Sequence, residues 1–497
     1  VFIDKLYVDG KPVTYIFDAQ TYPPPGEPRW IYEEGGGVIV YINPGETVQI
    51  KGVTGNISLD PGVTHEVTIY TAQGFEFHRV LHSRIVSPVS FPSGGIKAYD
   101  TGLKDPNDPS KRIILIYLKI ENNWEEDLYI TRVELYDPDT RQLLGNMDVS
   151  PPINIAPGES WTPQRLRDLI KVGVNPGKYI INVTWKCGNR GGGLAAYLEV
   201  SSKPLKIYVI DITGDRSKFI DKVLAYSITK QYADIEVIST REQLYEFFNN
   251  PPEKNVIVIN FHGIVFPIPG YNDISGQPGL FVKVPPADST GNWENDLEVT
   301  YIGGTKVPYW SYFIGESVAE NGLILVGTGG TFEYYVNNDY KDTWKSPESS
   351  FIDTGINGLW GVLHITSGVI QEGIGKIIVG NYTELVSDIA WLFEDDSIKV
   401  NKTPIRTAVY DVFYNSLPAD SYYVFYTTNY STYPVSSIAI RRGQGFVIFN
   451  GWVYPGSYRW QYTVPPLNSE EDATRFYTKI SIYEAIYVYL MEYVIGG

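Results

Sequence analysis

Hydrophobic and polar positions follow three successive patterns along the chain. Over residues 1–95, short alternating runs such as KLYV and TVQIKG are separated by turn signals, among them Asp9-Gly10, which favours a two-residue hairpin. Residues 96–204 alternate more regularly and contain about seven candidate strands, as in RIILIYLKI and LYITRVELY. From residue 205 onward, buried apolar runs are separated by helical patterns, as in βαβ units. We therefore expect two β-sandwich domains, 1–95 and 96–204, followed by a Rossmann-like α/β domain, 205–497.

The α/β region is best specified between residues 205 and 263. LKIYVIDI and NVIVINFHG read as parallel strands, and a helix is expected between them over 216–232. The apolar residues expected on the buried face of this helix are Ile220, Val223, Leu224 and Ile228. Ser239 and Glu242 have the spacing of a capping box for a second helix, and Ser469 is expected to begin an amphipathic C-terminal helix. Two long insertions, about 264–309 and 337–351, exceed ordinary loop lengths.

The composition disfavours some classes of binding partner but does not identify a reaction. The 497 residues carry a formal net charge of −17, which disfavours nucleic acid because phosphate binding requires a surplus of Lys and Arg. The chain has 39 Tyr and 11 Trp but only 2 Met and 1 Cys. Because Met and Cys are easily damaged by heat and oxidation, this composition is typical of a protein from a thermophile. The single cysteine, Cys187, excludes an internal disulfide and a Cys-only metal site. No stretch is long and apolar enough to predict a membrane span.

Five N-x-S/T sequons are candidate glycosylation sites in an exported protein. They lie at Asn56, Asn182, Asn381, Asn401 and Asn429. The sequence begins at Val1, which is consistent with removal of a leader and also with a trimmed chain. We expect an extracellular or cell-surface location.

Residues 110–200 resemble the immunoglobulin-like or fibronectin-like sandwiches of prokaryotic, particularly archaeal, cell-surface proteins. The resemblance rests on IENNWEEDLYITRVELYDPDTRQLL, the turn IAPGES and the ending VNPGKYIINVTW. The Cys-Trp-Cys signature of true immunoglobulin domains is missing, so only the architecture is implied.

Residues 205–497 resemble the class I glutamine amidotransferase-like fold, including degenerate relatives in surface proteins. The segments that carry the resemblance are LKIYVIDI, NVIVINFHG, GLILVGTGGTF and GQGFVIFNG. In active members a cysteine lies in a Gly-flanked elbow, and a His and a Glu follow near the end of the domain. Here Thr328 stands in the cysteine position and no His follows His364. The resemblance therefore implies an inactive domain, and we expect no catalytic residue.

Several chemical alternatives remain open in the sequence. Thr328 could be a nucleophile if a base such as His262 lay beside it. A caspase-like interpretation of the FHG triplet fails because Cys187 lies upstream, in the β region. The acidic positions that could serve a glycosidase or a calcium site are Glu333, Asp339, Asp342, Glu394, Asp395 and Asp396. We expect no cofactor, but the oxygen-rich loop with Asp105, Asn107 and Asp108 leaves a structural calcium ion open.

Three hypotheses follow for the function. The first is an extracellular structural protein, an S-layer or filament subunit of a thermophilic archaeon, that associates with itself or with neighbouring surface proteins. The N-terminal strand is a candidate for pairing with a neighbour's sheet edge. The second is a surface module for glycan or peptide, with the aromatic-rich insertion 264–310 as its binding wall. The third is an extracellular hydrolase that uses Thr328 and His262.

Overall fold

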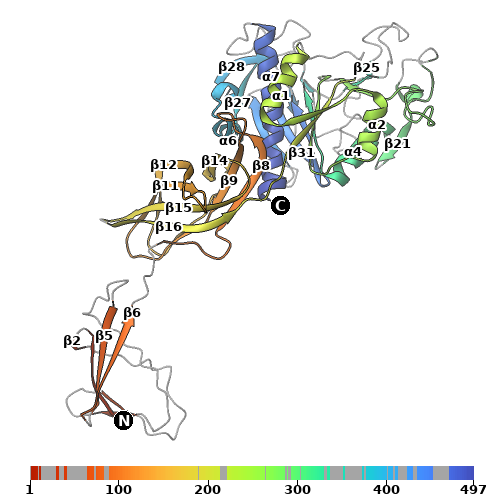
Figure 1. Ribbon diagram of the computed structural model, residues 1–497. Coiled ribbons are helices and arrows are strands. Elements are labelled where there is room, and N and C mark those ends of the chain that lie inside the picture. The colour runs from red at the N-terminus through yellow and green to blue at the C-terminus, as the bar shows by residue number, and fades with distance from the viewer. Residues whose placement is uncertain are drawn as a thin grey trace. The chain divides into compact units, whose positions relative to one another are not determined.

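The protein is rich in β-structure, with several sheets and a smaller number of helices (Figure 1). The computed structural model describes residues 2–8, 11–12, 30–32, 38–41, 64–71, 74–82, 89–188, 190–212, 221–262, 265–285, 288, 293–302, 304–328, 333–335, 351–352, 372–373, 377–399, 401–406, 409–411, 422–428, 434–450 and 469–496. Contacts divide the chain into two units, residues 1–90 with 122–125, and residues 91–121 with 126–497. The expected division at 204/205 falls inside the second unit.

The N-terminal unit contains a six-stranded sheet of order β3-β4-β1-β5-β6, with β2 paired to β1. The strands of this unit are β1 (Phe2–Val8), β2 (Lys11–Pro12), β3 (Trp30–Tyr32), β4 (Val38–Tyr41), β5 (Thr64–Thr71), β6 (Glu76–His82) and β7 (Val89–Ser90). Val8 pairs with Lys11, so the hairpin expected at Asp9-Gly10 is confirmed. The N-terminal strand β1 pairs with β4 on one side and β5 on the other. It is therefore paired on both sides within its own sheet, whereas we had considered it as a strand that pairs with a neighbour's sheet edge.

The second unit begins with a four-stranded sheet, β12-β11-β15-β16, and a three-stranded sheet, β14-β9-β8. Its strands are β8 (Ile96–Lys104), β9 (Arg112–Leu118), β10 (Ile120–Asn122), β11 (Leu128–Tyr136), β12 (Leu143–Ile155), β13 (Ser160–Trp161), β14 (Ile170–Val174), β15 (Lys178–Cys187) and β16 (Arg190–Glu199). A 3₁₀ turn, η2, covers Leu166–Asp168. Gly145 of β12 lies directly against Val172 of β14, which joins the two sheets.

The rest of the unit is organised by an eleven-stranded mixed sheet. Five neighbouring strands, β18-β17-β19-β23-β32, are parallel, and the remaining strands continue the sheet in antiparallel fashion as β31-β30-β27-β28, with β29 and β26 off this path. The strands of this sheet are β17 (Lys206–Ile210), β18 (Asp234–Ile238), β19 (Ile257–Asn260), β23 (Ile324–Thr328), β26 (Glu372–Gly373), β27 (Ile377–Tyr382), β28 (Asn401–Arg406), β29 (Val409–Asp411), β30 (Tyr422–Thr428), β31 (Pro434–Arg442) and β32 (Gly445–Asn450).

Smaller strands and the helices complete the unit. The short strands are β20 (Val265–Pro267), β21 (Val299–Ile302), β22 (Thr305–Pro308), β24 (Glu333–Tyr335) and β25 (Phe351–Ile352). The helices are α1 (Lys222–Tyr232), α2 (Arg241–Asn249), α3 (Trp293–Asp296), α4 (Tyr309–Asn321), α6 (Glu384–Phe393), the 3₁₀ turn η5 (Asp396–Ile398), α7 (Glu470–Tyr489) and the π-helical turn η8 (Leu490–Ile495).

Alternation along β17 separates two cores, one on each face of the mixed sheet. Ile207 and Val209 pack with α1, α6 and α7, whereas Tyr208 and Ile210 pack with α2 and α4. Parallel strands with helices on both faces are buried on both sides, which explains their continuous apolar runs. Figure 1 shows α7 running beside α1 along one face.

Two local expectations, one for α1 and one for α2, differ from the structure. Val223 is 79% exposed, whereas Ile228 is buried as expected, together with Ala225, Thr229 and Tyr232. Ile220 lies outside the described residues. The capping box of α2 is formed by Thr240 and Gln243, one residue later than the expected pair of Ser239 and Glu242. Both pairs have the same spacing, and the register of the buried face, Leu244, Phe247 and Phe248, decides between them.

The C-terminal helix α7 begins as expected and then departs from the expected pattern. Ser469 accepts a hydrogen bond from the Asp472 amide, so the predicted cap is confirmed. From Ile480 to Leu490, however, every residue is buried, so this part of α7 is not amphipathic. Tyr483 and Glu484 find hydrogen-bond partners inside the protein, whereas the buried Ser481 hydroxyl has none among the described residues.

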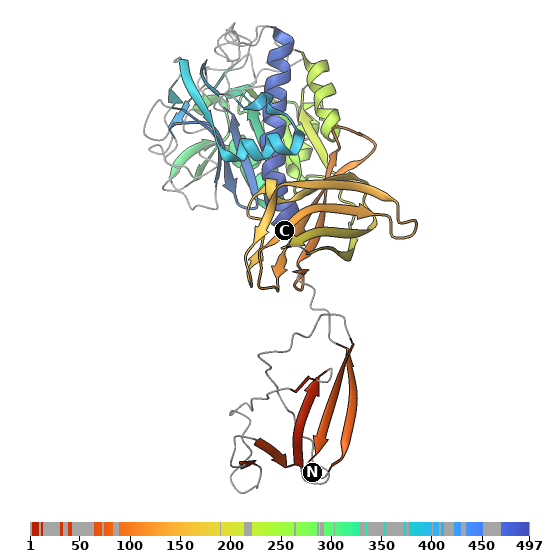
Figure 2. The same cartoon turned by 90° about the vertical axis from the view of Figure 1, so that its left-hand side faces the viewer.

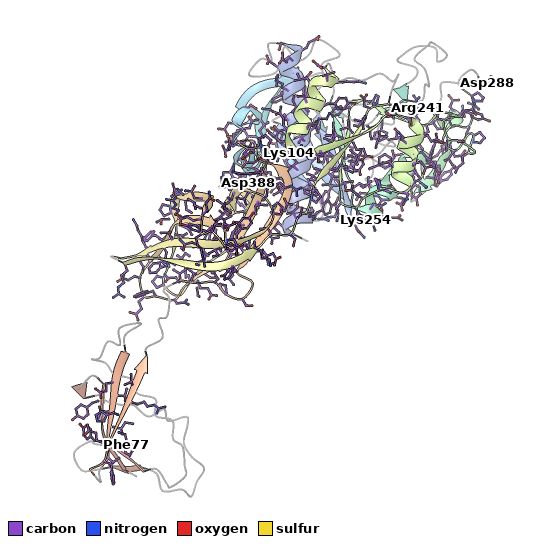
Figure 3. All side chains as sticks on the ribbon, viewed as in Figure 1. Phe77, Lys104, Arg241, Lys254, Asp288 and Asp388 are labelled. Carbon is purple, nitrogen blue, oxygen red and sulfur yellow. The ribbon has the colours of Figure 1, made fainter. Side chains whose placement is uncertain are left out.

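The β-region of residues 96–199, which holds strands β8 to β16, and the mixed sheet share one hydrophobic core. Ile113 and Leu115 of β9 pack with residues of β17, α1 and α7, while Ile114 and Ile116 are buried on the opposite face of β9. Polar contacts reinforce the junction: the Lys104 ammonium lies 2.9 Å from Asp234. Lys104 and Asp388 (Figure 3) both lie at this boundary.

A substitution at Gly102 tests how closely strand β8 packs against residues 203–205, which lead into β17. Gly102 has φ +72°, and an added Cβ would lie 2.4 Å from the Leu205 amide nitrogen and 2.6 Å from the Lys203 carbonyl oxygen. We expect Gly102→Ala to lower the free energy of unfolding by at least about 2 kcal/mol. The substitution adds a clash with the backbone to the strain of an alanine held at positive φ. The matched control is Gly158→Ala, with φ +73° and open space around its Cβ, for which only the strain of about 1 kcal/mol applies. Equal losses for both variants in urea unfolding would contradict the clash.

Candidate functional site

The carboxyl ends of the parallel strands form the first candidate site. Such edges hold the ligands of most open α/β sheets. Here β17 is followed by Asp211, β19 ends at Asn260 and is followed by His262, and β32 ends at Asn450. Asn260, His262 and Asn450 are at most 1% exposed. β23, between β19 and β32, ends at Thr328. Thr328 and His262 therefore follow neighbouring strands at one edge, as the sequence suggested.

His262 is held by the backbone around it. Its Nε2 accepts a hydrogen bond from the Ile212 amide at 2.8 Å, so the neutral ring carries its proton on Nδ1. Its own amide donates to the Asn260 side chain. The carboxylate of Asp211 lies 4.0 Å from Nε2 and is bound by Lys222 and Tyr226. A general base needs a lone pair directed at the reacting proton, and the Nε2 lone pair of His262 is already used.

Thr328 is described only through its backbone. It pairs in parallel register with Asn450 of β32. Its side chain and residues 329–332 lie outside the described part of the chain. The structure thus brings the backbones of Thr328 and His262 to one edge and engages His262 in a structural hydrogen bond.

A buried carboxyl group lies beside this edge, and sequence reasoning missed it. Glu484 of α7 is 1% exposed; its two oxygens accept hydrogen bonds from Ser437 Oγ at 2.7 Å and Asn450 Nδ2 at 3.2 Å. Burial raises the pKa of Glu484 to about 8, although both hydrogen bonds oppose the shift. The group is therefore protonated at neutral pH. A glutamate within YEAIYVYL was the only available signal, and it reads equally well as a surface position.

The acidic run after α6 serves the local structure. Glu394 pairs with Lys171, whose ammonium lowers the pKa of this carboxyl. Asp395 caps η5 through the Ser397 amide and binds Lys479 and the Tyr483 hydroxyl. Asp396 pairs with Lys399 at 2.6 Å. Glu333 lies in β24 with its side chain undescribed, and Asp339 and Asp342 lie outside the described residues.

The loop expected to suit calcium uses its oxygens within its own turn. Asp105 accepts from the Asn107 amide, and Asp108 accepts from the amide and hydroxyl of Ser110 and pairs with Lys111. A pocket of about 260 Å³ beside Asp105 and Asn107 is also lined by the Lys171–Glu394 pair. Within the described residues, no group of three or more His, Cys, Asp or Glu side chains is arranged to hold a metal ion.

The five sequons lie in different surroundings. Asn182 is half-buried on β15, and its amide donates to Glu134 Oε2 at 3.1 Å. Asn381 of β27 and Asn401 of β28 lie directly opposite each other in the sheet. Asn56 and Asn429 are outside the described residues. Glycosylation at these positions stays a prediction.

The aromatic residues of the 264–310 insertion are mostly turned inward. Phe266, Phe281 and Trp310 are at most 2% exposed and pack against each other and against α2. Tyr301 is the one large hydrophobic side chain of this segment that the described residues expose, at 68%. The expected aromatic binding wall is therefore a hydrophobic core in the part of the insertion that the structure describes.

Comparisons with known proteins give no family for the chain. No family model matches it, and no curated protein matches it. Among solved structures, a calcium-binding mutant of β-glucuronidase 2 from Bacteroides uniformis is 10% identical with a TM-score of 0.17, covering 80% of this chain and 43% of that one. A Salmonella α-2-macroglobulin mutant is 13% identical with a TM-score of 0.17, covering 35% and 11%.

Dimeric latent PorU from Porphyromonas gingivalis is 16% identical with a TM-score of 0.15, covering 40% of this chain and 16% of that one. The chain thus spans less than half the length of each of these three proteins. At such TM-scores the similarities carry no inference about fold or function. Separately, no helix in the described residues has the length and apolar character needed to cross a membrane.

Proposed function

We propose that the chain is an extracellular structural subunit that assembles with copies of itself into a surface layer or filament. The observation that carries the proposal is the apolar edge of the N-terminal unit. Phe75, Phe77 and Val80 lie on and beside β6, an end strand of the sheet within the described residues, and are 64%, 55% and 59% exposed. An edge strand presents unpaired backbone N–H and C=O groups to another chain, and soluble proteins normally avoid long edge strands that also expose apolar side chains.

Residues 205–497 serve as a scaffold in this proposal. Their five parallel strands, with helices on both faces, support a Rossmann-like domain related to the glutamine amidotransferase-like fold. Two features argue against catalysis at the carboxyl ends of the parallel strands. Threonine stands at residue 328, where the resemblance expects a cysteine, and the Nε2 lone pair of His262 accepts a hydrogen bond from the Ile212 amide. The hydrolase alternative needs a base beside Thr328, and the base proposed for it, His262, is engaged in this hydrogen bond.

Electron microscopy of the purified full chain tests the proposal, together with its mass measured by light scattering over a range of concentrations. We expect the mass to rise with concentration and ordered sheets or filaments to form at the highest concentrations. A chain that stays monomeric throughout, or forms only irregular aggregates, would overturn the proposed function. Turnover of an ester, amide or glycoside that Thr328→Ala abolishes would favour the hydrolase instead.

A further inference from the structure

The strand β6 has its neighbour β5 on one side and forms the end of the sheet as far as the described strands go (Figure 2). Every residue from Gly74 to Val80 is exposed. Phe77 (Figure 3) is directly opposite Ile69 of β5. Phe75, Phe77 and Arg79 alternate with Glu76, His78 and Val80, so the aromatic side chains share one face of the sheet.

The hydrogen-bond pattern of the β5–β6 hairpin fixes which backbone groups face outward. The Thr71 amide donates to the Phe75 carbonyl at 2.9 Å, which makes this a hydrogen-bonded pair. Hydrogen-bonded and non-hydrogen-bonded pairs alternate along an antiparallel ladder. The backbone groups of Phe77 and Arg79 therefore also point toward β5, and those of Glu76, His78 and Val80 point away from it. A new strand would bond to these even-numbered residues.

We infer that β6 pairs in antiparallel fashion with β6 of a second copy of this chain, with Phe77 opposite the second copy's Phe77. This inference rests on the proposed function and names its contact. Because only even-numbered residues offer outward backbone groups, paired residue numbers must add to an even sum. A two-fold axis at Phe77 meets this condition, since Glu76 then pairs with the second copy's His78.

Two neighbouring registers oppose like charges, and this register does not. It places Phe75 opposite the second copy's Arg79, whose guanidinium can stack on the ring. It also places Glu76 opposite the second copy's His78, although Glu76 already contacts His78 of its own chain at 3.1 Å. A register centred on Glu76 sets two carboxylates against each other, and one centred on Arg79 sets two guanidinium groups against each other; like charges directly opposed are destabilising. A register centred on His78 places each Phe77 opposite the second copy's Arg79 and so loses the pairing of the two Phe77 rings.

The pairing also extends the apolar face of the sheet. Ile69 and Phe77 lie side by side on β5 and β6, and Val67 is opposite Arg79 on the same face. Across the two-fold axis, Phe77 meets its copy in a non-hydrogen-bonded pair, where opposed side chains approach most closely. The joined face would run from Ile69 through the two Phe77 rings to the second copy's Ile69. A strand from an unrelated protein could supply the backbone bonds, but not this self-complementary set of side chains.

The test uses the full chain with Phe77→Lys and Phe77→Glu, alone and mixed. Phe77 is exposed, so neither change should impair folding, and Tyr301→Lys is a matched control on another exposed aromatic residue. We expect each variant alone to associate about tenfold more weakly, through loss of the aromatic pair and opposition of like charges, and an equimolar mixture to recover the association.

The outcomes separate the inference from the proposed function. A wild-type chain that never associates overturns both. A wild-type chain that associates while both Phe77 variants do so equally well keeps the assembly function and overturns the β6 contact. Weakened variants that do not recover on mixing overturn the self-opposed register and favour a different strand as the partner of β6.

Cysteine crosslinking gives a second measurement. The one natural cysteine, Cys187, is 2% exposed, so a new thiol on β6 would react alone. Under mild oxidation, we expect Phe77→Cys to form a covalent dimer, because opposed non-hydrogen-bonded residues suit disulfide geometry. Arg79→Cys, on the same face but opposite the second copy's Phe75, should remain monomeric on a denaturing gel. Equal crosslinking at both positions would overturn the register.

Discussion

Replacing Arg165 with alanine is expected to lower the free energy of unfolding by about 3 kcal/mol, because it strands a buried carboxylate. Arg165, next to η2, donates from Nη2 to Asp388 Oδ1 at 2.8 Å and from Nε to Asp388 Oδ2 at 3.3 Å. The Asp388 side chain is 2% exposed, and burial raises its pKa while Arg165 opposes the rise. Arg165 also binds Glu384 at 2.7 Å, so it joins the β-region to two positions of α6.

Two controls make the Arg165 result specific. Arg167 lies 3.8 Å from Asp388, and its side chain is 48% exposed; its replacement by alanine should cost less than about 1 kcal/mol. Asp388→Asn removes the stranded charge and should restore part of the stability lost in Arg165→Ala. Urea unfolding of the four variants at pH 7 measures the coupling. A loss in Arg165→Ala no larger than that in Arg167→Ala would show that the buried pair contributes little.

The second large effect concerns pH and Glu484. Its folded-state pKa of about 8 lies above the ordinary glutamate value of 4.5. Between these two values the unfolded chain releases a proton that the folded protein keeps, so stability falls as pH rises and levels off above the folded pKa. From pH 6 to pH 9 this site alone should lower the free energy of unfolding by about 3 kcal/mol.

Glu484→Gln removes this dependence and retains a neutral side chain of similar shape. Its amide can still accept a hydrogen bond from Ser437 or Asn450. We expect the variant to match the wild type near pH 5 and to exceed it increasingly toward pH 9, as followed by thermal unfolding across this range. Glu471→Gln, an exposed residue of the same helix, should leave the pH profile unchanged. Parallel profiles for Glu484→Gln and the wild type would mean that Glu484 is ionised in the folded protein.

Local patterns predicted local structure well in this chain. The hairpin at Asp9-Gly10 and the cap at Ser469 each depend on residues adjacent in sequence, and both are confirmed. The α2 cap was misplaced by one residue because Ser239 and Thr240 both fit the motif and only packing of the helix separates them. Val223 fits the 3.6-residue period, yet the direction in which α1 meets the sheet leaves it exposed.

Features that depend on strand order could not be predicted. Glu484 finds Ser437 and Asn450 only because α7 lies across β31 and β32, and nothing near Glu484 in sequence indicates this. Likewise, among the described strands β3 and β6 are the ends of the N-terminal sheet, whereas the N-terminal strand β1 lies between β4 and β5. The alternation of apolar and polar residues predicts which side chains share a face of a strand. It does not predict which strands lie beside it in the sheet.

The core shared by β9 and α7 also constrains the order in which the protein can fold during synthesis. β9 leaves the ribosome long before α7, which is the last described helix, yet Ile113 and Leu115 are covered by the core that α7 completes. The early β-region must therefore carry an uncovered apolar face until more than 350 further residues have been made. Such intermediates are prone to aggregation. For an exported chain, this favours keeping the whole of residues 91–497 unfolded until translocation is complete.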